Sequence, residues 1–168
     1  MLFLKKLDPK KHVTSKYFKW MNDKFVQLHT EQKYLKHSLK NIKKFVKDKN
    51  KSKTDFLFGI FIKKGKLMNH IGNIKLGPIN WIHKCAEISY FIGEKDLWDS
   101  GYTTLAIKRI IKLAKKKKIK KLKAGCYEKN YGSVKVLKKN GFKLEGKFKS
   151  EKIFKKKRVT YNWYGKLL

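Results

Sequence analysis

Apolar and polar positions follow two spacings along the chain, and these predict an ordered series of strands and helices. Runs typical of strands are found at residues 2–7, 55–62, 67–76, 87–92, 122–127, 142–153 and 159–167. Helical spacing is found at residues 13–21, 39–49, 101–114 and 132–140. Ser38 is the expected N-cap of the second of these helices, and the expected apolar stripe of the third is Ile107, Ile110, Ile111 and Ala114. Gly77-Pro78 is expected to end the third strand. The bulky run 88–92 is typical of a central strand buried on both faces.

The order of these elements predicts a single α/β domain over residues 1–168. A strand, a helix and a strand alternate in the middle of the chain, which implies a crossover and one parallel strand pair. Turns at Lys64-Gly65 and at Lys155-Lys156-Lys157 imply hairpins on either side of it. We therefore expect a mixed sheet with helices packed on it.

The chain carries a formal net charge of +33, from 45 basic and 12 acidic residues. This excess predicts non-specific, salt-sensitive attraction to nucleic acids and other polyanions. Sequence-specific readers depend on the bidentate fork of arginine, and Arg109 and Arg158 are the only two arginines. Lysine is spread along nearly every segment, which favours a compositional bias. A nucleic-acid-binding module stays as an alternative from another functional class.

Cys85 and Cys126 are the only cysteines, and their spacing fits neither a metal site nor a disulfide framework. Five scattered histidines show no ligand spacing either, so no metal is expected. The N-terminus lacks a signal-peptide pattern, and no apolar run has the length of a membrane span. We expect a cytoplasmic protein without a membrane partner.

The most informative segment joins the strand ending at Ile92 to the helix that begins near Gly101. A glycine and small hydroxyl residues at such a turn expose backbone N–H groups, and the helix dipole makes the turn attractive to a pyrophosphate. By itself the pattern is weak, because Ser or Thr at a helix start is usually an N-cap. The residues concerned are Trp98, Ser100, Gly101, Tyr102, Thr103 and Thr104.

A second motif, Asn130-x-x-Ser133 followed by a short helix and Gly141-Phe142, makes the pattern more specific. With both motifs in order, nearly the whole chain resembles the GNAT acetyltransferase superfamily. The likeness is to the branch of ribosomal-protein N-terminal, spermidine and aminosugar acetyltransferases. The resemblance implies a mostly antiparallel sheet with one splayed parallel pair and about four helices. It also implies acetyl-CoA as co-substrate.

The phosphate loop departs from the pattern of that branch. Asp99 stands in place of a glycine, Ser100 in place of a lysine, and Thr103 in place of a small residue. A carboxylate beside a pyrophosphate is unfavourable, although nearby lysines offset it.

The resemblance further implies direct attack of a neutral amine on the thioester. Backbone groups at Phe91 and Ile92 would contact the cofactor and the developing oxyanion. Glu87 is the first candidate for the base and His83 the alternative, while a strand-end pair between Glu87 and Lys84 is an equal interpretation. Ser133 is the candidate proton donor to the thiolate, or else a cap or cofactor contact. Asn130 is expected to bond the pantetheine or the neighbouring backbone.

The acceptor is expected to be a small-molecule primary amine, with an aminosugar favoured, either free or linked to a nucleotide. This rests on Gly77-Pro78-Ile79-Asn80-Trp81, which looks like a loop of family members in sugar pathways. A protein N-terminus is the alternative acceptor, and a homodimer is left open. The candidate acceptor-binding residues are Trp20, Asn22, Asn73, Asn80, Trp81 and His83.

Overall fold

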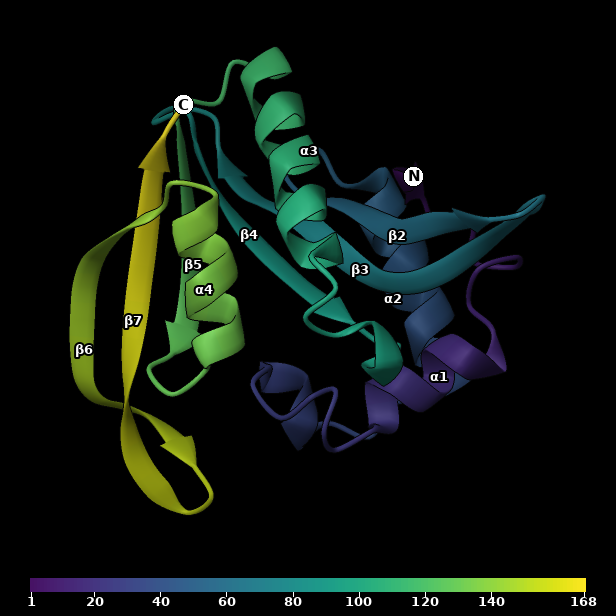
Figure 1. The fold of residues 1–168 in the computed structure, drawn as a ribbon, viewed down its shortest axis with the longest axis horizontal. Coiled ribbons are helices and arrows are strands. Elements are labelled where there is room, and N and C mark those ends of the chain that lie inside the picture. The colour runs from purple at the N-terminus through teal and green to yellow at the C-terminus, as the bar shows by residue number, and fades with distance from the viewer.

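A seven-stranded sheet with the order β1-β2-β3-β4-β5-β7-β6 runs through the computed structural model, which describes residues 1–168 except for the side chain of Lys64 (Figure 1). Every neighbouring pair is antiparallel except β4–β5, which is parallel. The predicted mixed α/β fold is therefore confirmed. The strands are β1 (Leu2–Lys6), β2 (Phe56–Lys64), β3 (Leu67–Asn80), β4 (Cys85–Ile92), β5 (Lys121–Tyr127), β6 (Lys143–Phe154) and β7 (Lys157–Leu167). The helices are α1 (Ser15–Asn22), α2 (Leu39–Lys51), α3 (Tyr102–Lys116) and α4 (Tyr131–Lys139), with 3-10 turns η1 (Glu31–Tyr34) and η2 (Lys95–Leu97).

Helices cover both faces of the sheet, with α3 and α4 in front and α2 behind it in Figure 1. The predicted stripe on α3 is buried in the larger core through Ile107, Ile110 and Ala114. The second core holds α1 and α2 against β2. Because apolar side chains are buried on both sides, the sheet is a rigid platform for the residues at its strand ends.

The parallel pair β4–β5 separates soon after it begins. The two strands pair only from Cys85 to Glu87 on β4 and from Lys121 to Lys123 on β5. Beyond that point β4 stays with β3, whereas β5 stays with β7 along its whole length. Backbone groups on the facing edges of the separated strands therefore need other partners, such as water or a ligand.

Two expectations about the middle strands are wrong. Gly77-Pro78 does not end β3, because a register shift between Leu76 and Ile79 absorbs the proline and the strand continues to Asn80. The shift brings Ile79 N to the carbonyl oxygen of Thr54 at 2.8 Å. Nor is β4 buried on both faces: Ser89 is exposed, because the separation from β5 leaves this part of the strand uncovered.

The predicted N-cap of α2 is confirmed. Ser38 Oγ accepts a hydrogen bond from Asn41 N at 3.1 Å, and Asn41 Oδ1 accepts one from Ser38 N at 2.8 Å. This reciprocal capping satisfies two backbone donors at the helix start. No helix in the described chain is both long enough and apolar enough to cross a membrane.

Candidate active site

A cavity of about 930 Å³ opens where β4 and β5 separate. Its walls come from β3, β4 and β5, the N-terminus of α3, one side of α4, and the segment between α1 and α2. Many of the predicted site residues converge on this wall although they come from β3, β4, α3, α4 and the loops before the two helices. They are Asn73, Phe91, Ile92, Trp98, Gly101, Tyr102, Thr103, Thr104, Asn130 and Ser133.

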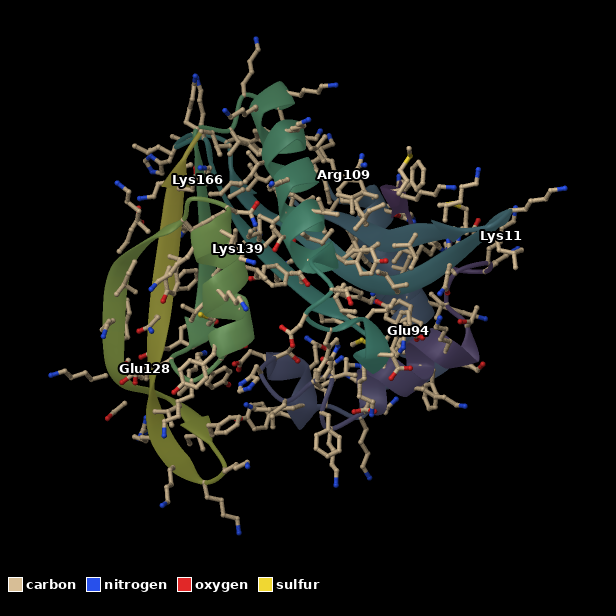
Figure 2. All side chains as sticks on the ribbon, in the orientation of Figure 1. Lys11, Glu94, Arg109, Glu128, Lys139 and Lys166 are labelled. Atoms are coloured by element: carbon tan, nitrogen blue, oxygen red, sulfur yellow. The ribbon has the colours of Figure 1, made fainter. Side chains whose placement is uncertain are left out.

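The N-terminus of α3 provides an anion-binding wall. Gly101 is the N-cap in the left-handed conformation, with φ of 80°, and no side chain caps the helix there. The first N–H groups of α3 therefore have neither an intrahelical partner nor a side-chain cap, and the residues that carry them line the cavity. Lys135 and Lys139 line the cavity from α4, and Lys139 is labelled on that helix in Figure 2. These cations offset the charge of Asp99, which also lines the cavity.

The end of β4 is clamped by Trp98. Its indole Nε1 donates to the Ile92 carbonyl oxygen at 2.9 Å, so this carbonyl is already satisfied within the protein. Ser100 takes no part in the wall, because its side chain is exposed and its Oγ bonds back to the Trp98 carbonyl at 3.4 Å. The prediction of Ser100 as a cofactor-binding side chain is not supported by this placement.

A hydroxyl network lies at the start of α4. Asn130 Oδ1 accepts from Ser133 N at 3.2 Å and so caps the helix, one of its two expected roles. Ser133 Oγ and Tyr90 OH are 2.8 Å apart. Burial raises the pKa of Tyr90 above its ordinary value, so the phenol keeps its proton. Burial likewise raises the pKa of the neighbouring Cys126 thiol to about 11, against a hydrogen bond with Ser133 that lowers it.

On the other side of the separated strands, the segment between α1 and α2 lines the cavity with polar and aromatic groups. His29 is half-buried there and stacks on Phe154, with ring centroids 5.4 Å apart and planes 5° apart. Burial, and then the charge of Lys33, hold the pKa of His29 below its ordinary value. His29 is therefore neutral at physiological pH. Glu31 and Gln27 line the same part of the cavity.

This segment is fastened across the cavity to the β6–β7 hairpin. Tyr34 OH donates to the Ile153 carbonyl oxygen, and Lys152 Nζ lies 3.9 Å from Glu31 Oε2. Tyr127 OH at the end of β5 donates to Glu31 Oε1 at 3.0 Å. We call residues 24–37 the strap, because it links the α1–α2 side of the molecule to the hairpin.

The turn between β3 and β4 does not contribute to the cavity wall. Asn80 Oδ1 accepts from His83 N at 2.9 Å, and Trp81 Nε1 donates to the Lys53 carbonyl at 3.3 Å, so these side chains stabilise the turn itself. The turn precedes β4, whereas the cavity lies toward its far end; the seven residue steps along β4 span about 23 Å. Asn80, Trp81 and His83, which were expected to bind the acceptor, therefore lie outside the wall of this cavity.

Trp20 and Asn22 have structural surroundings. Trp20 is buried against Gly93 and donates from Nε1 to Glu94 Oε1 at 3.0 Å, and Figure 2 shows Glu94 beside α1. Asn22 donates from Nδ2 to the Phe18 and His37 carbonyls, both at 3.1 Å. Both were expected to bind the acceptor, and neither side chain is part of the cavity wall. Asn73, in contrast, is buried in the wall with Oδ1 2.9 Å from His70 Nε2.

Glu87 lies just before the point where the strands separate. Its carboxylate pairs with Lys123 at 3.8 Å instead of with Lys84, and its side chain is outside the cavity wall. The sequence had not indicated Tyr90, His29, Glu31 or Tyr161, all of which line the cavity. Alternation along β4 places Tyr90 on the same face as Ile88 and Ile92, which is a signal for this residue. The strap has no comparable periodicity.

Comparison with known proteins agrees with the architecture. The family model of the acetyltransferase (GNAT) domain matches residues 2–143. No curated protein matches the sequence. The fold is similar to that of spermidine N-acetyltransferase from Vibrio cholerae in complex with CoA and spermine, with a TM-score of 0.87, 17% identity, and coverage of 99% of this chain and 95% of that one.

Two further solved structures are similar at comparable levels. The ribosomal L7/L12 α-N-protein acetyltransferase RimL, in complex with coenzyme A as a CoA–cysteine disulfide, gives a TM-score of 0.85 at 21% identity, covering 99% of this chain and 94% of that one. The microcin C7 self-immunity acetyltransferase MccE, in complex with acetyl-CoA and AMP, gives a TM-score of 0.83 at 19% identity. The match covers 99% of this chain and 92% of that one. At such identities these likenesses establish the fold.

Proposed function

The chain belongs to the GNAT acetyltransferase family and is an acetyl-CoA-dependent N-acetyltransferase, and on this premise we propose that the cavity between β4 and β5 is where the acetyl group passes to a primary amine. The observation that carries the proposal is the early separation of the parallel pair beside an uncapped helix N-terminus. The gap accepts an extended chain that hydrogen-bonds to strand edges, and the helix start accepts its phosphates.

The residues present fit acetyl-CoA as co-substrate. We assign the pyrophosphate to the backbone N–H groups from Tyr102 to Thr104, with Lys135 and Lys139 adding positive charge. The pantetheine is assigned to the gap between the facing edges of β4 and β5. A backbone N–H near Ile92 is then placed to stabilise the oxyanion as the amine nitrogen bonds to the thioester carbon and the C–S bond breaks.

For the base that removes the amine proton, we propose His29 in preference to Glu87. His29 lines the cavity on the side of the strap, where we propose that the acceptor binds, and its imidazole is neutral at physiological pH. Glu87, in contrast, is paired with Lys123 outside the cavity wall. A neutral imidazole takes up a proton directly or through one water molecule.

His29→Gln is expected to lower kcat by about 100-fold, while Glu87→Gln stays within about threefold of the wild-type value. A base must be deprotonated to act, so activity falls as pH drops through its pKa. Because the pKa of His29 is lowered, the wild-type enzyme should keep its activity to a pH below the ordinary histidine range. The pH profiles of kcat/KM for both variants test this. Loss of activity in Glu87→Gln alone would return the base role to Glu87.

The acceptor is proposed to be a small-molecule amine, with an aminosugar first among the classes to be tested. The strap is fastened to the β6–β7 hairpin across the cavity, which suits an enclosed small acceptor better than a protein chain. The MccE structure is a complex with acetyl-CoA and AMP, which supports including nucleotide-linked aminosugars.

Release of the CoA thiol with a panel of aminosugars, nucleotide-linked aminosugars and N-terminal peptides tests the acceptor class. We expect the highest kcat/KM for an aminosugar. A peptide that exceeds every sugar by about tenfold in kcat/KM, a difference of about 1.4 kcal/mol, would show instead that the strap opens for protein chains.

Cys126 is the residue of the cavity wall that we expect to form a disulfide with oxidised coenzyme A. It is a free, buried cysteine on the cavity wall beside Ser133, and RimL is known as a disulfide with coenzyme A. We expect CoA disulfide to react with Cys126, giving a mixed protein–CoA disulfide and one free CoA thiol. Because burial raises the pKa of Cys126, the reaction should be slow at neutral pH and faster in alkali.

Mass spectrometry of the protein after incubation with CoA disulfide measures this adduct. Cys126→Ala should prevent it and protect the enzyme from inactivation. Cys85→Ala is the matched control, and an adduct that is lost in this variant instead would contradict the assignment.

A further inference from the structure

The ammonium group of Lys33 is surrounded by aromatic rings from three separate parts of the chain. Its Nζ lies 4.2 Å from the ring centroid of Tyr127 on β5, 4.8 Å from that of Phe154 on β6, and 4.9 Å from that of Tyr34 on the strap. Each distance is within the range of a cation–π interaction, which becomes stronger as the cation loses water. We call these three rings the cage.

Polar contacts complete the surroundings of this cation. Lys33 Nζ donates to Tyr127 OH at 3.0 Å and to the Leu28 carbonyl oxygen at 3.3 Å. Tyr127 OH in turn donates to Glu31 Oε1 at 3.0 Å. Because Glu31 also lines the cavity, the hydrogen-bonded chain from Lys33 to Glu31 connects the cage with the acceptor part of the site.

The arrangement differs from the other lysine–aromatic contacts in the molecule. The remaining lysines that the structure describes near a ring approach one ring each, as Lys117 approaches Phe56 and Lys24 approaches Phe25. Three rings around one ammonium, with a carboxylate behind a phenol, is the chemistry by which proteins bind organic ammonium ions. In this chain the protein's own lysine fills that position.

We propose that the cage is an organic-ammonium site occupied by Lys33, and that this internal cation makes the enzyme discriminate against acceptors with a second cationic group. The discrimination rests on the proposed function, whereas the site itself does not. A second ammonium group of the acceptor near Glu31 is repelled by the positive charge of Lys33. It also has no free aromatic ring to contact, because all three rings of the cage already contact Lys33. Monoamines and uncharged sugar amines meet no such conflict.

Substitutions that remove the Lys33 side chain from the cage test whether the cage binds organic ammonium ions. Lys33→Ala removes both the ammonium and the stem, whereas Lys33→Met removes the charge but keeps the cage filled with a chain of similar length. Calorimetric titrations with tetramethylammonium and with 1,4-diaminobutane, without acetyl-CoA, compare both variants with the wild type. We expect Lys33→Ala to bind each ion about tenfold more tightly than the other two proteins do.

A second variant tests where the ion binds. Adding Phe154→Ala to Lys33→Ala removes one wall of the cage and should abolish the gain. Equal, weak binding by all four proteins would overturn the proposal, whatever their acetyltransferase activity. A gain in Lys33→Met equal to that in Lys33→Ala would also overturn it, because the cage is then filled and only charge has changed.

The wild-type chain allows a test that does not depend on a variant folding. A caged ammonium should react slowly with an amine-acetylating reagent, whereas Lys36 on the same strap is exposed. Mass spectrometry of the partly modified protein gives both rates. We expect Lys33 to react at least about tenfold more slowly than Lys36, and equal rates would show that Lys33 does not occupy the cage.

Discussion

Gly101→Glu is expected to weaken acetyl-CoA binding by at least about 100-fold, because it places a carboxylate where the helix start meets the phosphates. A Cβ at Gly101 meets no atom within 4 Å, so the new side chain fits into the space that the co-substrate needs. The backbone φ of 80° adds conformational strain for any residue other than glycine. Calorimetric titration with acetyl-CoA measures the loss.

Gly65→Glu is the matched control. Gly65 has a φ of 61°, also meets no atom within 4 Å of a Cβ, and lies in the β2–β3 turn away from the cavity wall. The two substitutions therefore share the strain and the change in net charge. Gly65→Glu should keep wild-type affinity for acetyl-CoA. Equal losses in both variants would mean that global charge, and not the start of α3, determines binding.

Ser133→Ala is expected to lower kcat by about 100-fold, the usual scale for a lost general acid. We propose that this hydroxyl protonates the departing thiolate and that Tyr90 OH, 2.8 Å away, holds it in position. Tyr90→Phe should therefore cost about tenfold in kcat without raising the KM for acetyl-CoA. The backbone N–H of Ser133 still donates to Asn130, so α4 keeps its cap in the alanine variant. Steady-state kinetics separates the two parameters.

Ser89→Ala removes a hydroxyl from another wall of the same cavity and serves as the control. It should remain within about threefold of the wild-type kcat. The donor assignment is contradicted if the kcat of Ser133→Ala equals that of Ser89→Ala.

The sequence predicted the fold, and it indicated many of the residues that line the cavity around the starts of α3 and α4, because the signals there are local. The residues around the start of α3, from Trp98 to Thr104, form one short segment, and the Asn130-to-Gly141 motif is a single short helix with its two ends. The left-handed Gly101 starts α3 and the Asn130 side chain caps α4, so each start is specified by residues next to it in the sequence. For the same reason Ser38 could be identified as the N-cap of α2.

The strap side of the cavity, where we propose that the acceptor binds, could not be predicted from the sequence because it is assembled from distant segments. His29 meets Phe154, and Tyr34 meets Ile153, only after the sheet has brought the hairpin beside the strap. No spacing in the sequence contains that information. The β3–β4 turn was assigned to the acceptor site from its resemblance to a loop, and the direction of β4 places it at the opposite end.

The most direct test of the account is a calorimetric titration of the wild-type protein with acetyl-CoA at low and at moderate salt, with ATP as an anion control. The charge of +33 attracts any polyanion, and salt screens that attraction. We predict saturable binding of one acetyl-CoA per chain that persists at moderate salt and is tighter than that of ATP. Two results would contradict a specific acetyl-CoA site between β4 and β5. One is acetyl-CoA binding that is lost at moderate salt, and the other is an affinity for ATP equal to that for acetyl-CoA.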